Sequence, residues 1–264
     1  MHVDVYDQFK FTDSFLHHLD SRVKVILTVV FILSNAILPD GSWLAFLVTW
    51  FLILILNEIA NLGLAYTLKR SYVVLPFLVV AVSAIFSPQG KPLTSIDLGF
   101  ITLVPTDFGI IRFLSILIRS WLSVQLALLL VATTQFPSLI HAFEHLMIPR
   151  VITTIIAFLY RYLFVLTDEA HRMMRAREAR SATIPGMKRG GNLIWRIRIV
   201  GNMAGQLFLR SYDRSDRIYQ AMLSRGYAGY MRTLKPHDME KLDWMTLLMG
   251  ISLFAIVQMM GWIS

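Results

Sequence analysis

The sequence RAREAR at residues 175–180 and the sequence SRGY at residues 224–227 each close a long run of helical character. Helix-breaking residues follow both runs within a few positions, which predicts that each helix ends there. These residues are Pro185, Gly186, Gly190 and Gly191 after the first run, and Gly226 and Gly229 in and after the second. We therefore predict two long helices, each with a basic tip.

The composition is that of a membrane protein. Of the 264 residues, 56% are hydrophobic and 16% are charged, and the mean hydropathy is +0.59. A soluble domain carries about 25% charged residues. We predict an all-α polytopic membrane protein. The chain contains no cysteine, which excludes disulfides, thiolate metal sites and cysteine nucleophiles.

Positive charge is concentrated in one segment. Residues 137–241 hold 17 of the 25 Lys and Arg residues but only 8 of the 17 Asp and Glu residues, and this net charge of +9 exceeds the +8 of the whole chain. Cytoplasmic segments of membrane proteins carry such an excess. We predict that residues 137–241 are cytoplasmic. Their charge suits anionic lipid headgroups and an acidic protein partner better than nucleic acid.

Apolar runs on either side of this segment predict about five transmembrane helices. They are Val25–Leu38, Trp43–Ala60, Tyr72–Phe86, Ile110–Phe136 and Trp244–Trp262. With Lys69-Arg70 inside, the N-terminus lies in the cytoplasm and the C-terminus outside. The turn at 39–42 and the loop at 87–108 then lie outside, and alternating apolar residues in that loop predict a small hairpin.

Residues 151–166 are also apolar, but we do not interpret them as a span. Arg161 lies in their middle, and the helical pattern continues to Arg180. A helix of about 30 residues is roughly 45 Å long, which suits a helix that starts in the membrane interface and extends beyond it. The predicted organisation is a membrane part at 1–136, coupling helices at 137–241 and a last span at 242–264.

Two polar features fall within the predicted spans. Arg119 lies about two turns deeper than Arg112, so we expect Arg119 to face the interior of the bundle, as buried membrane arginines do. Asn57-Glu58, near the inner end of the second span, is either a proton site or an interfacial cap.

The two tips allow two interpretations. An arginine at a helix C-terminus interacts favourably with the helix dipole and need do nothing more. Alternatively, an exposed arginine on a slim tip enters a groove and forms a bidentate pair with a carboxylate. The small residues Ala176, Ser224 and Gly226 keep both tips slim.

The chain resembles the transmembrane T component of energy-coupling factor (ECF) transporters, especially the cobalt/nickel type. That family carries two Ala-Arg-Gly-like tripeptides at the ends of two cytoplasmic coupling helices, and the matching residues here are Ala176-Arg177-Glu178 and Ser224-Arg225-Gly226. Glu178 replaces Gly and Ser224 replaces Ala. Residues 16–24 resemble the family's N-terminal Leu-His-x-Leu-Asp-Pro-Arg-x-Lys, with Ser21 in place of Pro, and residues 160–173 resemble the first coupling helix.

The resemblance implies a non-catalytic subunit of an ATP-driven importer for cobalt or nickel ions in a bacterial plasma membrane. It implies as partners two copies of a cytoplasmic ABC ATPase and a separate membrane subunit that captures the substrate. The tripeptides at 176–178 and 224–226 would then bind the ATPase. The sequence itself has no G-x-x-x-x-G-K-[ST] loop for ATP, and we predict no cofactor.

Two rival functions remain open. A secondary transporter would need ionisable residues deep in several spans, where only Arg119 qualifies clearly. A membrane metalloenzyme could use His141 and His145, which have the i, i+4 spacing of metal ligands on one helix face. No third ligand accompanies them, so we predict no metal site.

Overall fold

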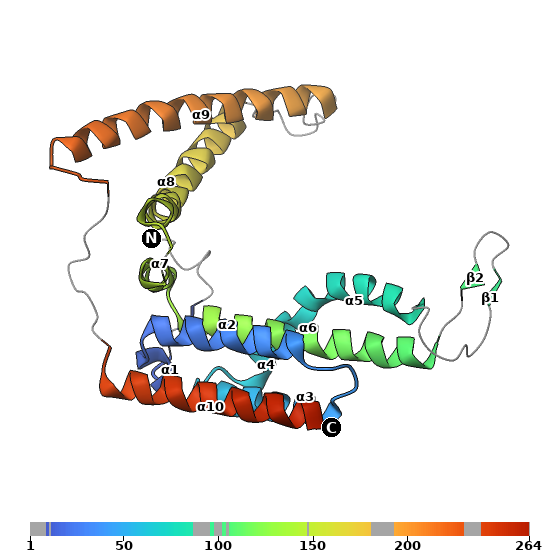
Figure 1. The fold of residues 1–264 in the computed structure, drawn as a ribbon. Helices are drawn as coiled ribbons and strands as arrows, with labels where there is room; N and C mark the ends of the chain where they lie inside the picture. The colour runs from blue at the N-terminus through green and yellow to red at the C-terminus, as the bar shows by residue number, and fades with distance from the viewer. Residues whose placement is uncertain are drawn as a thin grey trace. The chain divides into compact units, whose positions relative to one another are not determined.

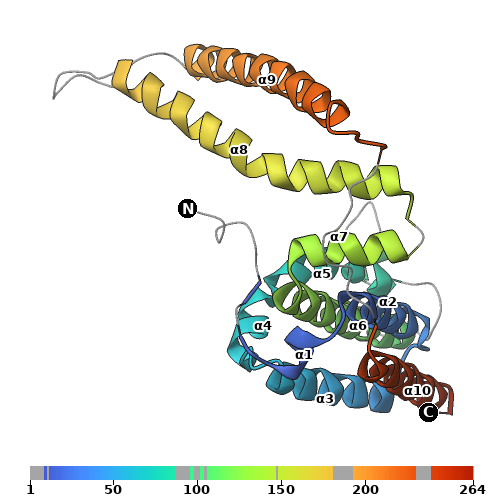
Figure 2. The same ribbon diagram turned by 90° about the vertical axis from the view of Figure 1, so that its left-hand side faces the viewer.

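The computed structural model describes residues 9–10, 12–86, 96–97, 102–103, 106–146, 148–180, 193–229 and 239–263 (Figures 1 and 2). The chain divides into two compact units, Met1–Leu146 with His237–Ser264, and Met147–Pro236. We call them the bundle unit and the coupling unit. The predicted breakers at 185–191 and most of the linker before the last span lie outside the described residues.

The described elements are helical apart from one short ladder. The bundle unit contains α1 (Phe15–His18), α2 (Ser21–Ile37), α3 (Trp43–Ile59), α4 (Leu64–Arg70), η2 (Ser71–Val74), α5 (Leu75–Val82), η3 (Ser83–Phe86), β1 (Ile96–Asp97), β2 (Thr102–Leu103), α6 (Asp107–Thr133), α7 (Phe136–His145) and α10 (Lys241–Ile263). The coupling unit contains α8 (Arg150–Arg180) and α9 (Leu193–Leu223). The prediction of an all-α polytopic membrane protein is confirmed.

Helices α2 and α10 lie side by side and run parallel (Figure 1). At their starts, the backbone N–H of Asp20 donates to Asp243 Oδ1 at 3.1 Å. Further along, the rings of Phe31 and Phe254 meet edge to face at 4.3 Å between centroids. Both pairs have the same offset in sequence, so the two helices stay in register over their length.

Helix α6 runs antiparallel to α2. Lys24 Nζ, near the start of α2, donates to the carbonyl of Thr133 at the end of α6 (3.1 Å). Asn35 Nδ2, near the end of α2, donates to the carbonyl of Arg119 in the middle of α6 (3.0 Å). The apolar core between α2, α3, α6 and α10 consists of Phe31, Leu38, Ala45, Phe46, Ile53, Leu122, Leu126, Phe254 and Val257.

Local sequence signals set the ends of these helices. The Asp20 carboxylate caps α2 by accepting a hydrogen bond from the backbone N–H of Arg22 (2.7 Å), and Thr106 Oγ1 caps α6 through the N–H of Gly109 (3.1 Å). Such caps satisfy backbone donors that the first helical turn leaves free. Between α2 and α3 the chain turns at Gly41, whose φ of +88° is readily adopted by glycine.

The predicted apolar runs lie in described helices, but the helices long and apolar enough to span a membrane are not the same five. By length and composition, four described helical segments can cross a membrane: Tyr66–Ile85, Asp107–Thr133, Arg150–Arg180 and Lys241–Ile263. Helices α2 and α3 have 17 residues each, or about 25 Å, which is short of a hydrocarbon core of about 30 Å. Our interpretation of α8 as an interfacial helix, and the domain limits built on it, stay predictions.

The predicted hairpin in the loop before α6 is confirmed. Strands β1 and β2 pair antiparallel, with Ile96 opposite Leu103 and Asp97 opposite Thr102. The side of the membrane on which the hairpin lies stays a prediction.

Candidate functional site

Helices α8 and α9 form the frame that carries both arginine tips. Each has 31 residues, or about 46 Å, and they run antiparallel (Figure 2). Glu169 of α8 accepts from Arg210 Nη1 of α9 at 2.6 Å and pairs with Arg172 Nη2 at 2.9 Å. An open groove lies on one side of this ion pair and a second cleft on the other. The helices therefore cross at Glu169 and diverge towards both ends.

The second tip is a helix-ending motif. The N–H of Gly226 donates to the carbonyl of Leu223 (3.0 Å), and the N–H of Tyr227 donates to the carbonyl of Met222 (3.0 Å). This is the hydrogen-bond pattern of a Schellman motif, which needs a residue with positive φ. Gly226 supplies it, with a φ of +76°. Arg225 is thereby held, exposed, on the last turn before the chain reverses.

The first tip has a different structure. Helix α8 continues through Ala176, Arg177 and Glu178 to Arg180, so no residue here needs the positive φ that favours glycine. This explains how Glu178 can stand where the family pattern has Gly. Arg177 is half-buried and lines the cleft between the second half of α8 and the first half of α9, whereas Glu178 is exposed. The structure therefore does not bring Arg177 and Arg225 together: they lie at opposite ends of the crossed pair.

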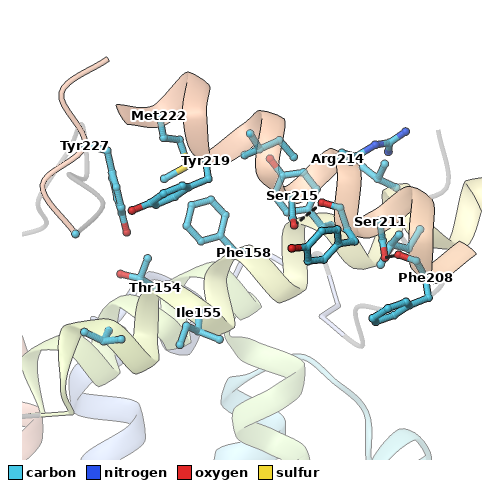
Figure 3. A pocket seen from close by; sticks show the side chains of 17 residues that line it. Thr154, Ile155, Phe158, Phe208, Ser211, Arg214, Ser215, Tyr219, Met222 and Tyr227 are labelled. Carbon is cyan, nitrogen blue, oxygen red and sulfur yellow. Dashed lines mark hydrogen bonds between the residues drawn. The ribbon is translucent and has the colours of Figure 1, made fainter. Parts of the chain in front are cut away.

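An apolar groove lies below the second tip, between the first half of α8 and the second half of α9. It has a volume of about 580 Å³. Side chains from both helices and from Tyr227 converge on it (Figure 3). Six aromatic residues line it: Phe158, Tyr162, Phe208, Tyr212, Tyr219 and Tyr227. Tyr227 and Met222, which occupy the two positions where an apolar contact frequently accompanies a Schellman motif, both line this groove. Sequence reasoning missed the groove, although its aromatic residues recur at helical spacing.

Arg119 lies in the bundle unit and pairs with a residue that sequence reasoning did not identify. Its Nη2 donates to Asp40 Oδ1 at 2.7 Å, and the two side chains are 18% and 22% exposed. Arg112 Nε lies 3.9 Å from the other oxygen of Asp40. The guanidinium of Arg119 also lies over the ring of Phe46, 5.7 Å from its centroid. Sequence reasoning could have identified Asp40 as this partner, because the predicted turn at 39–42 lies at the same depth in the membrane as Arg112.

The N-terminal motif holds the bundle together. Asp20 caps α2, as described above, and Lys24 Nζ donates to the carbonyls of His17 (3.2 Å) and Thr133 (3.1 Å). Lys24 is buried, and its ammonium group needs such acceptors. His17 in turn hydrogen-bonds Ser14 Oγ through Nδ1 (2.7 Å), and burial lowers the pKa of His17. The residues of the N-terminal motif therefore form hydrogen bonds within the bundle unit.

The rings of the two histidines of α7 lie against each other. The rings of His141 and His145 meet edge to face at 4.9 Å, and His141 Nδ1 lies 3.7 Å from Glu144. Burial lowers the pKa of His145. Within the described residues, no group of three or more potential ligand side chains could hold a metal ion.

Asn57 is buried and donates to the carbonyl of Ile53, one turn back in α3 (3.0 Å).

Comparison with known proteins relates this arrangement to a family. The family described as CbiQ, cobalt transport protein, matches residues 12–237. An energy-coupling factor transporter transmembrane protein EcfT of Macrococcus caseolyticus is 28% identical over 242 residues, covering 88% of this chain and 87% of that protein. The EcfT of Lacticaseibacillus paracasei is 28% identical over 227 residues, covering 82% of each chain.

An uncharacterized protein of Methanocaldococcus jannaschii is 28% identical over 256 residues, which is 96% of this chain and 85% of that protein. The resemblance noted in the arginine and N-terminal motifs therefore extends over nearly the whole sequence. The chain belongs to the CbiQ family of ECF-transporter transmembrane components, and it is a non-catalytic membrane subunit.

Proposed function

We propose that this chain is the transmembrane coupling subunit of an ECF-type ABC importer for cobalt or nickel ions. Its partners are two copies of a cytoplasmic ATPase and a separate membrane subunit that captures the ion. The description of the matched family as a cobalt transport protein supports the choice of ion.

The observation that carries the proposal is the position of the two tips. Arg177 and Arg225 lie at opposite ends of a crossed helix pair that is joined at Glu169. Two ATPase subunits that each hold one tip can therefore move the helices relative to one another. When ATP closes the ATPase dimer, the crossing angle changes, and the membrane part tilts the capture subunit so that the ion is released inward.

The apolar groove supports a second contact. Its aromatic lining suits a membrane-protein helix, because such helices present apolar side chains that fill grooves of this kind. We assign this groove to the capture subunit and the charged tips to the ATPase. The ATPase then binds the charged tips and the capture subunit binds the apolar groove of the same pair of helices.

The test is pull-down of the ATPase by the purified chain, with ion uptake measured beside it. Arg177→Ala and Arg225→Ala should each weaken assembly by about 2–5 kcal/mol, because each leaves a partner carboxylate unpaired. The double variant should abolish assembly and uptake. Arg→Lys should rescue poorly, since lysine lacks the planar fork of arginine.

Arg217 provides the matched control, because it is an exposed arginine of α9 away from both tips. Arg217→Ala should cost about 1 kcal/mol or less. If it weakens assembly as much as the tip variants do, only the diffuse positive charge matters and the tip mechanism is wrong. Ion uptake by the chain without any ATPase would instead favour a secondary transporter, and tight metal binding lost in His141→Ala would favour a metalloenzyme.

A further inference from the structure

A second cleft of the coupling unit includes Arg177, but most of its lining has no role in the proposed function. It lies between the second half of α8 and the first half of α9 and has a volume of about 640 Å³. We call it the basic cleft, because four arginines and a single carboxylate line it: Arg172, Arg177, Arg180, Arg210 and Glu169.

The positive charge of the basic cleft is only partly compensated. Glu169 pairs with Arg172 and Arg210 at the crossing of the helices. Arg177 and Arg180, near the end of α8, have no ion pair with any described residue. Two guanidinium groups that share one open cleft repel each other, and an anion between them would relieve this repulsion. The cleft therefore has the charge of an anion site.

Part of the lining of the basic cleft is apolar, and we call this part its floor. Met173 of α8 and Trp195, Ile199 and Met203 of α9 line it, and the amides of Asn202 and Gln206 add hydrogen-bonding groups. A small, fully hydrated anion gains nothing from such a floor. A ligand with both an anionic head and an apolar body matches the whole surface.

The flank of the cleft is also suited to lipid. At the start of α9, Leu193, Ile194 and Ile197 are exposed by 63–70%, and Trp195 by 46%. Arg196 and Arg198 alternate with them along the chain. Apolar side chains and tryptophan mixed with arginines are typical of helices that lie in the membrane interface. An occupant that carries negative charge alone would leave this apolar flank uncovered, which favours lipid as the occupant.

We propose that the basic cleft binds an anionic phospholipid, with the phosphate between Arg177 and Arg180 and the start of the acyl chains on the apolar floor. Basic pockets between transmembrane helices on the cytoplasmic side bind acidic headgroups, and the same charge chemistry is present in this cleft. The site goes beyond the proposed function. Because Arg177 also belongs to the proposed ATPase contact, Arg180 and Met203 are the residues to test.

The experiment is native mass spectrometry of the full-length chain in detergent. Phosphatidylglycerol is added as the anionic probe, phosphatidylcholine as the zwitterionic probe and inorganic phosphate as the simple anion. We expect retention of phosphatidylglycerol in preference to phosphatidylcholine, and no displacement by equimolar phosphate. Arg180→Ala should weaken the retention about fivefold. Met203→Asp, which puts a carboxylate on the floor, should weaken it at least as much, and Arg217→Ala should leave it unchanged.

Three results would overturn the proposal. Equal retention of both lipids would show that headgroup charge is not recognised, and displacement by phosphate would reduce the cleft to a simple anion site. If Arg180→Ala leaves lipid retention intact but weakens the ATPase pull-down, the cleft belongs to the protein partner. The proposed ATPase contact is tested separately by the pull-down of Arg225→Ala, because Arg225 lies outside the basic cleft.

Discussion

At the scale of single residues, the two arginine tips show how similar sequences can have different geometry. Gly226 has a positive φ and ends α9, which leaves Arg225 exposed on the last turn. Glu178 occupies the matching place in the first tip, and there the helix continues. One tip is therefore defined by its backbone, and the other is a side chain on a regular helix.

Substitution of Gly226 tests this difference. Gly226→Ala should destabilise the helix end by about 1–2 kcal/mol, since a Cβ disfavours the left-handed conformation. We expect ATPase pull-down to fall because Arg225 loses its position. Gly226→Asn should be milder, as asparagine is also found at this place in helix ends. A Gly226→Ala variant that assembles as well as the parent would mean that the cap does not position Arg225.

The ion pair of Arg119 and Asp40 makes a second prediction at this scale. The two side chains are mostly buried and 2.7 Å apart, and a hydrogen bond to a charged group contributes about 1.5–3 kcal/mol. Arg119→Ala and Asp40→Asn should each lower the stability of the chain in detergent. Thermal unfolding of the single and double variants gives the coupling energy. Strictly additive losses would show that the pair contributes nothing as a pair.

At the scale of elements, the bundle depends on close approach between α2 and α10. A Cβ atom built on Gly250 would overlap the side chain of Leu27, and one on Gly261 would overlap Leu38. Both contacts have the sequence offset of the Phe31–Phe254 pair. The glycines therefore allow α10 to remain against α2 over its whole length.

A larger residue in place of one of these glycines should push α2 and α10 apart. Gly250→Leu should destabilise the chain by about 1–3 kcal/mol through overpacking, measured as a lower midpoint of thermal unfolding. Adding Leu27→Ala should restore part of the lost stability, because the smaller alanine leaves room for the new leucine side chain. Gly205→Leu on α9 is the control, because nothing lies within 4 Å of a Cβ built there. Equal losses at Gly205 and Gly250 would contradict the packing explanation.

At the scale of the whole molecule, packing fixes the direction of each helix relative to its neighbours. Helices α2 and α10 are parallel, and α6 is antiparallel to both. The Oγ of Ser71, at the start of η2, accepts from Trp121 Nε1 in the middle of α6 (3.2 Å), while the backbone at Ile85 meets Thr106 just before α6. The segment from α4 to η3 is therefore antiparallel to α6. Five crossings would require these directions, and the number of crossings stays a prediction.

The side of the membrane can be determined with single cysteines, because the parent chain has none. Glu178→Cys should react with an impermeant maleimide only from the cytoplasmic side, and Asp107→Cys, at the start of α6, only from the external side. Sealed right-side-out vesicles report labelling from the external side, and sealed inside-out vesicles report labelling from the cytoplasmic side. Labelling of Glu178→Cys from the external side alone would make α8 a span and the five-span topology wrong.

The sequence by itself determined the all-α membrane class, the positions of the main apolar helices, the hairpin before α6 and the family. These features depend on local patterns, which are hydropathy, turn residues and short motifs. Only the tertiary structure decided that Arg119 meets Asp40, that Arg177 lines a cleft while Arg225 is exposed, and that aromatic residues of α8 and α9 share one groove. The reason is physical: each of these contacts joins residues far apart in the chain, and side-chain packing between helices, which no local pattern encodes, determines which of them meet.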